Sequence, residues 1–272
     1  MKKIRMAAHP YALWLALFTA IPMLIVFYYA FTNDAGAFTL DNFRDMTAYS
    51  VVFFNSFRLA IITTVVCLFL GYPMAYAMSL LGKKGRTISM ILIMLPMWMN
   101  FLLRTYAWLT ILENNGLLNH FLGLLHLPAL NIINTPAAVG IGMIYNYLPF
   151  MILPIYNSLE NMEESLIEAA QDLGCSSRHV FAKVILPLSL PGVISGVIMV
   201  FVPGVSTFVI SRILGGGSSI LLGDLIEMQF LGGTYDANMG AALSLVMMVI
   251  ITIFTLITDH IDNGGEESVL MS

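Results

Sequence analysis

The chain has 272 residues, of which 58% are hydrophobic and only 10% are charged, and its formal net charge is -4. A soluble globule cannot hide that much apolar surface, so the composition indicates an all-α integral membrane protein. The few Lys and Arg residues are scattered, which argues against a nucleic-acid partner. The two cysteines are too few and too differently placed for a disulfide framework or a metal site.

Apolar runs of about 20 residues, long enough to cross a bilayer, predict six transmembrane helices within one domain, residues 11–258. The first run follows a basic segment, residues 1–10, and is longer than the roughly 7 to 15 apolar residues of a signal peptide. We therefore expect an uncleaved anchor, with a signal peptide as the alternative. The six predicted spans are 11–31, 51–81, 88–112, 136–156, 187–214 and 239–258.

The distribution of basic residues gives this arrangement an orientation. Of the twelve Lys and Arg residues, eight fall on one side of the six predicted spans. The positive-inside rule assigns that side to the cytoplasm. Both termini, including a tail of residues 259–272, and the loop 159–186 are then cytoplasmic. The eight residues are Lys2, Lys3, Arg5, Lys83, Lys84, Arg86, Arg178 and Lys183.

Arg104 lies inside the third predicted span, where a charge is costly unless it faces a pore or a partner. We expect it to form a gate or an interface ion pair; snorkelling or a structural pair is the alternative. Aromatic residues in nearby spans are candidate walls of a transport pathway, because rings attract organic cations, although membrane-interface belts use the same residues. The candidates are Trp98, Tyr106, Trp108, Tyr145, Tyr147 and Phe208.

The loop 159–186 is the one long hydrophilic interruption between two apolar spans. Its carboxylates recur every fourth residue, which predicts an amphipathic helix with the apolar side chains turned away from them. The carboxylates are Glu160, Glu164, Glu168 and Asp172, and the apolar residues are Leu159, Met162, Leu166 and Leu173.

Three kinds of residue predict how this helix ends and the next begins. Gly174 can adopt the left-handed conformation that ends a helix, and Ser176 or Ser177 can cap a second one. Pro187 and Pro191 suit the first turn of the following apolar segment, where a missing backbone donor costs little. The loop is therefore predicted to be helix, tight turn, helix.

The spacing of Glu168-Ala169-Ala170, Gly174 and Val184-Ile185-Leu186-Pro187 resembles the EAA loop of ABC-importer permeases, with Val184 where Ile is usual. An ordinary amphipathic connector is the alternative. Further stretches extend the likeness over most of the chain, toward the B-type permeases of spermidine/putrescine importers. They are GYPMAYAMSLL, LPMWMNFLLRTYAW, EAAQDLG, ILPLSLPGVISG and LLGDLIEMQFL.

This resemblance implies the type I ABC-importer permease fold, with six transmembrane helices and a cytoplasmic coupling-helix loop that sits in a cleft of an ATPase subunit. It also implies a second homologous permease, an ATPase dimer and an extracytoplasmic polyamine-binding protein as partners. The chain has no GxxxxGK[ST] phosphate loop, so we expect it to hold no cofactor while the ATPase binds ATP and Mg. The implied coupling residues are Glu168, Ala169, Ala170, Asp172, Leu173 and Gly174.

Acidic residues outnumber basic ones on the predicted outer side, which would concentrate a cationic solute or simply reflect Lys and Arg being kept inside. Asp224 and Glu227 share one helical face in segment 220–231 and are candidate ligands for an amine chain. Pro203-Gly204 interrupts the fifth span, either along the pathway or as a packing kink.

Other functions remain open at this point. The solute could be an amino acid, a metal ion or a sugar phosphate. A self-contained secondary transporter is less favoured, because no predicted span contains the Asp or Glu that proton coupling needs. An intramembrane enzyme is disfavoured by the absence of a serine elbow or HExxH motif and by five scattered histidines.

Overall fold

The structure is a computed structural model that describes residues 11, 13–233 and 235–270. These residues are helical almost throughout, and the β-structure among them is one isolated bridge between Thr32 and Phe38. The prediction of an all-α membrane protein is confirmed. The predicted N-terminal segment 1–10 lies outside the described residues.

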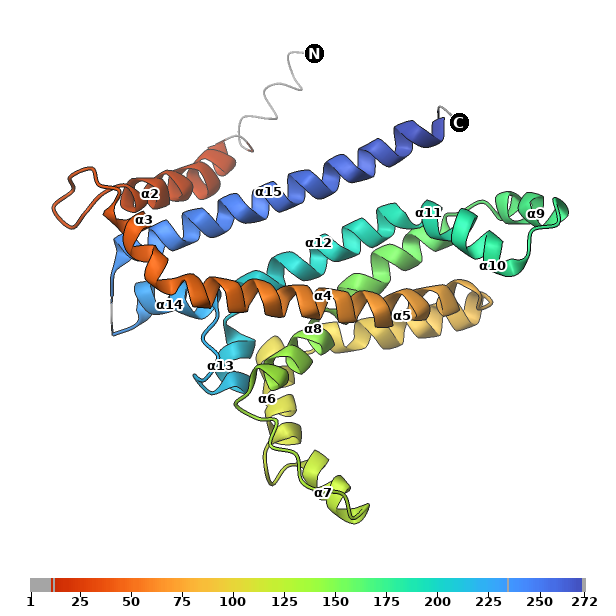
Figure 1. Ribbon diagram of the computed structural model, residues 1–272, viewed down its shortest axis with the longest axis horizontal. Coiled ribbons are helices and arrows are strands. Elements are labelled where there is room, and N and C mark those ends of the chain that lie inside the picture. The colour runs from red at the N-terminus through yellow and green to blue at the C-terminus, as the bar shows by residue number, and fades with distance from the viewer. Residues whose placement is uncertain (1–10, 12, 234, 271–272) are drawn as a thin grey trace. The chain divides into compact units, whose positions relative to one another are not determined.

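The helices are labelled as in Figure 1. In chain order they are η1 (Ala16–Ala20), α2 (Ile21–Ala30), α3 (Asp41–Asp45), η2 (Met46–Tyr49), α4 (Ser50–Ser79), α5 (Lys83–Trp98), α6 (Phe101–Leu112), α7 (Leu117–Leu124), α8 (Pro136–Glu160), α9 (Glu164–Asp172), α10 (Ser177–Val180), η3 (Phe181–Ile185), α11 (Leu186–Leu188), α12 (Leu190–Ser206), α13 (Val209–Gly215), α14 (Leu222–Leu231) and α15 (Ala237–Leu270).

Four helical segments among the described residues are long and apolar enough to cross a membrane: Leu13–Ala30, Asp41–Ser79, Pro136–Glu160 and Ala237–Thr258. Two bent helix pairs reach the same criterion, so the count rises to six if each pair forms one span. The pairs are Lys83–Trp98 with Phe101–Leu124, bent by 93°, and Ser177–Leu188 with Leu190–Ser206, bent by 58°.

The break between α5 and α6 interrupts the segment 88–112, which the sequence analysis treated as one continuous span. Asn100 causes the new helix to start there, because its side-chain oxygen accepts the backbone N–H of Leu102 at 2.9 Å and of Leu103 at 3.3 Å. Such a cap satisfies donors that a helix start otherwise leaves without partners. The chain therefore changes direction inside the apolar run.

By packing, the chain divides into two units, one of Met1–Val52 with Leu225–Ile253 and one of Phe53–Asp224 with Phe254–Ser272. In the first, small residues allow close contact: Ala30 of α2 packs with Ala241 and Ala242 of α15, and Phe43 and Phe230 cover them. The unit therefore has a small apolar core of its own.

The core of the second unit is built around α8, which α12 accompanies along its length (Figure 1). Gly192 lets α12 approach, since a Cβ there would lie 2.6 Å from both the Pro154 carbonyl oxygen and Ser158 Cβ. Helix α4 joins the same core: Tyr72 Oη lies 2.9 Å from Ser189 Oγ, at the bend between α11 and α12.

Candidate functional site at the coupling loop

Helix α9 ends at Gly174 as predicted, since this glycine has φ +79°. The Gly174 N–H donates to the Gln171 carbonyl at 2.8 Å, and the Cys175 N–H donates to the Ala170 carbonyl at 3.2 Å. Both bonds satisfy carbonyls that a helix end leaves unpaired, in the pattern of a Schellman motif. The turn therefore fixes the direction in which the chain leaves α9.

The second helix of the loop begins where it was predicted, but without the predicted serine side-chain cap. Helix α10 begins after Ser176, whose hydroxyl lies 3.2 Å from His179 Nδ1 and makes no capping bond to the backbone. The π-helical turn η3 continues into α11 and α12, and Pro187 and Pro191 occupy their first turns, as expected. The exposed Cys175 joins the two halves, whereas the other cysteine, Cys67, is buried.

One side of α9 faces the membrane domain through Ile167 and Ala170, which pack against the large core. The expected apolar face was only half right: Leu159 is buried and Met162 packs on the core, but Leu173 is 85% exposed and Leu166 45%. The four leucine and methionine residues straddle two faces of the loop, and the sequence analysis assigned them to one.

The outward side of α9 therefore carries Leu166, Ala169 and Leu173, whose spacing of three and four places them on one stripe. Of the residues predicted to couple to an ATPase, Ala170 alone packs inward. The others are exposed: Glu168, Ala169, Asp172, Leu173 and Gly174. The loop thus presents an apolar stripe flanked by carboxylates.

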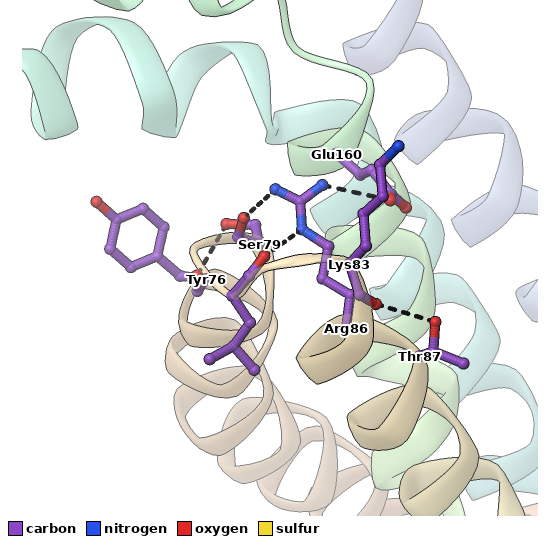
Figure 2. A network of polar contacts seen from close by, with 7 residues as sticks. Tyr76, Ser79, Lys83, Arg86, Thr87 and Glu160 are labelled. Atoms are coloured by element: carbon purple, nitrogen blue, oxygen red, sulfur yellow. Dashed lines mark hydrogen bonds and ion pairs between the residues drawn. The ribbon is translucent and has the colours of Figure 1, made fainter.

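Beneath α9 lies a cavity of about 330 Å³, lined by the end of α8, by α10 and by the turn between α4 and α5. Arg86 is at its edge and joins three helix ends (Figure 2). Its guanidinium donates to the carbonyls of Ser79 at 2.6 Å and Leu81 at 2.7 Å, and it lies 3.5 Å from a Glu160 carboxylate oxygen. We call this set of contacts the Arg86 clamp.

The sequence analysis counted Arg86 only among the cytoplasmic basic residues and Glu160 only among the carboxylates of the loop. Their pairing is tertiary and leaves no spacing pattern. The available signal was local: a basic residue just after a short Gly-containing turn lies near the open carbonyls of the preceding helix, where cations are favoured.

Replacing Arg86 by alanine is expected to destabilise the protein by about 1–3 kcal/mol, because two helix-end carbonyls lose a charged donor. Glu160→Gln is expected to change stability by less than about 1 kcal/mol, because the ion pair is partly exposed on both sides, with side-chain exposures of 31% and 39%. Thermal unfolding of the purified protein measures both. Equal losses would mean that the ion pair, rather than the capped carbonyls, holds the clamp.

The structure brings several candidate pathway residues of α6 and α8 together. Arg104 is only 8% exposed, donates to the Pro96 carbonyl at 2.6 Å and lies 5.8 Å from the centre of the Phe101 ring. Its Nε is buried and has no hydrogen-bond partner among the described residues. Trp108 and Tyr145 meet edge to face at 5.1 Å. Arg104 is thus held by a backbone carbonyl, a structural role like the one that the sequence analysis gave as the alternative to a gate. Its Nε can still donate to a further acceptor.

The other aromatic candidates lie elsewhere. Trp98 is 71% exposed, Tyr106 53% and Phe208 39%, so none of these three rings is buried against other described residues. Tyr147 is buried, and its hydroxyl donates to the Pro203 carbonyl at 3.3 Å. That bond satisfies a backbone group at the proline in α12.

Asp224 and Glu227 both lie on α14, as the spacing predicted. Asp224 is 6% exposed and accepts the N–H of Leu221 at 2.9 Å, which helps to start the helix. The neighbouring Leu222 N–H donates to Ser56 Oγ at 2.7 Å. Asp224 therefore has a capping role in this conformation, in addition to its predicted role as an amine ligand.

A helical membrane domain with a protruding EAA loop defines a class of transport permease. Residues 67–264 match the family described as "Binding-protein-dependent transport system inner membrane component". The chain belongs to this family, the membrane-spanning permeases of ABC importers, and is a transport subunit.

Individual relatives agree with this family. The chain is 37% identical over 255 residues to "Spermidine/putrescine transport system permease protein PotB" of Escherichia coli (strain K12), covering 90% of this chain and 92% of that protein. It is equally similar to PotB of Haemophilus influenzae, at 37% identity and 89% of each chain. "Inner membrane ABC transporter permease protein YdcU" of Escherichia coli is 31% identical over 79% of this chain and 74% of its own.

Solved structures share the fold. A chain of a bacterial ABC transporter involved in the import of the acidic polysaccharide alginate superposes with a TM-score of 0.78, covering 96% of this chain and 94% of that one at 17% identity. A chain of the MetNI methionine ABC transporter gives a TM-score of 0.62, covering 82% and 98% at 16% identity. The predicted type I importer fold is therefore confirmed.

Proposed function

We propose that this chain is the permease subunit of an ATP-driven importer of spermidine and putrescine. The observation that carries the proposal is the 37% identity to the spermidine/putrescine permease over nine-tenths of the chain. A second homologous permease completes the pathway, and an extracytoplasmic binding protein delivers the polyamine. Both termini and the coupling loop lie in the cytoplasm, in agreement with the positive-inside distribution of Lys and Arg.

The coupling loop is where this subunit meets its ATPase dimer. Leu166, Ala169 and Leu173 form an exposed apolar stripe that a groove on a partner can cover, and the flanking carboxylates of Glu168 and Asp172 suit basic residues at its rim. ATP and Mg are bound by that partner. This permease supplies the docking surface.

Movement of the loop is passed into the membrane through its inward contacts. Ile167 and Ala170 pack on the core, and the Arg86 clamp fastens the end of α8, where the loop begins, to the turn between α4 and α5. When ATP closes the ATPase subunits, α9 and the helix ends joined to it move together and the pathway opens outward. Hydrolysis returns it to the inward-open state.

The direct test is ATPase activity of the complete transporter in lipid, with the binding protein empty or loaded. We expect stimulation by protein loaded with spermidine or putrescine. Stimulation only by another loaded solute would keep the importer class and reject the polyamine. Failure of the chain to bind any ATPase would reject the assignment of the coupling loop.

A further inference from the structure

A second concave site lies in the smaller unit, and its lining contains none of the residues that the sequence analysis proposed as ligands. It is a cavity of about 410 Å³ between the segment that follows α2 and the segment that precedes α15. Its lining includes three tyrosines, two aspartates and an asparagine: Tyr28, Tyr29, Tyr235, Asp34, Asp236 and Asn238. Its volume falls within the range of about 300–1,000 Å³ typical of small-molecule sites.

The segment after α2 is held in place before any ligand arrives. Asn33 Oδ1 accepts the backbone N–H of Ala35 at 3.1 Å and of Ala37 at 2.9 Å, and Gly36 has φ +75°. Asn42 Nδ2 donates to the Thr32 carbonyl at 3.0 Å. A fixed backbone reduces the entropy lost on binding.

The second wall is equally ordered. Asp236 caps α15, since its Oδ1 accepts the Met239 N–H at 2.9 Å. Asn238 joins the two walls by donating from Nδ2 to Asp34 Oδ1 at 3.0 Å. Asn238 is only 7% exposed, and its own Oδ1 is buried without a hydrogen-bond partner in the part of the chain that the structure describes. An unsatisfied acceptor of this kind favours a bound donor.

The charged side chains in the lining of the cavity are all acidic. Asp34 and Asp236 each engage one carboxylate oxygen in the bonds just described, and neither forms an ion pair with a basic side chain among the described residues. The rings of Tyr28 and Tyr29 lie edge to face at 5.7 Å, and Tyr235 is 71% exposed. Carboxylates beside aromatic rings attract ammonium groups by ion pairing and by cation–π interaction.

We propose that this cavity is a binding site for an alkyl diamine or polyamine at the outer mouth of the permease. Asp34 and Asp236 pair with ammonium groups, and the tyrosine rings contact the methylenes and the charge. The positive end of the α15 dipole opposes a cation, and the Asp236 carboxylate at that end offsets it. The outer location rests on the proposed function, because the cavity lies one predicted span away from the cytoplasmic N-terminus.

The site is tested by direct binding to the complete transporter in lipid nanodiscs, without the binding protein. Titration calorimetry with spermidine and putrescine is compared with the neutral analogue 1,4-butanediol. The variant Asp34→Asn/Asp236→Asn keeps both hydrogen-bond acceptors and the helix cap but removes two charges. Asp45→Asn is the matched control, since Asp45 is an exposed carboxylate on the same connection and outside the cavity.

We expect saturable binding of the amines, no binding of butanediol and an affinity about fivefold or more lower in the double variant, as two partly exposed ion pairs would give. Asp45→Asn should bind like the unmodified protein. Unchanged binding in the double variant, or an equal loss in Asp45→Asn, would overturn the site. If the unmodified transporter binds amines here but polyamine-loaded binding protein fails to stimulate its ATPase, the site stands and the proposed import function falls.

Discussion

Replacing Gly174 by valine is expected to reduce uptake about tenfold or more while the protein still inserts and folds. The residue has φ +79°, and a β-branched side chain in this region costs roughly 1–2 kcal/mol or more. A Cβ at Gly174 would meet no described atom within 4 Å, so the strain lies in the backbone of the turn. We expect relief of the strain to turn α10 relative to α9 and so to disturb the loop surface that we propose docks the ATPase.

The matched variant is Gly174→Asn, because asparagine tolerates the left-handed region far better than valine does. Uptake in cells and the ATPase rate of the reconstituted transporter are measured for both. We expect Asn to keep most of the transport and Val to lose it together with stimulation by loaded binding protein. Full transport by the valine variant would remove the coupling role from this turn.

A second variant with a large expected effect is Gly192→Ala, which should lower the stability of the protein. In a helix, alanine normally stabilises relative to glycine by about 1 kcal/mol. At this position the added Cβ would lie 2.6 Å from the Pro154 carbonyl oxygen and from Ser158 Cβ, and backbone atoms cannot move aside cheaply. Overpacking of this kind costs about 1–3 kcal/mol. Gly192→Ala should therefore destabilise the protein, although Gly→Ala in a helix normally stabilises it.

Thermal unfolding of the purified protein in detergent decides between the two effects. Gly82→Ala provides the control, because a Cβ at Gly82 meets nothing within 4 Å and the residue has φ -66°. We expect Gly192→Ala to unfold at a clearly lower temperature and Gly82→Ala to stay close to the unmodified protein. A stabilised Gly192→Ala protein would show that α8 and α12 are less closely packed than the structure has them.

The features predicted well from the sequence are those that local chemistry determines. A helix stop at Gly174 and prolines in the first turns of α11 and α12 depend on neighbouring residues alone, and the structure has both. The apolar runs likewise identify the membrane segments, because length and composition decide whether a helix can cross a bilayer.

The features that were missed depend on direction and tertiary contact. Hydropathy does not report a change of chain direction, so the sequence analysis treated the segment around Asn100 as one continuous span. An asparagine before an apolar helix is nevertheless a recognised cap. The exposure of Leu173 could not be inferred from its apolar character, because a helix that docks a partner, as we propose for α9, needs apolar residues on two faces, one for the domain and one for the partner. The cavity at Asp34 joins residues some two hundred positions apart, and no spacing rule connects them.

The two cysteines give the protein a practical property. Cys175 is exposed in the turn of the coupling loop, whereas Cys67 is fully buried in the core of α4 and α8. A thiol reagent added to the folded chain is thereby directed to one place, the turn between α9 and α10. Spin labels, fluorophores or crosslinkers can be installed there in the natural sequence, with no engineered cysteine and no cysteine-free background.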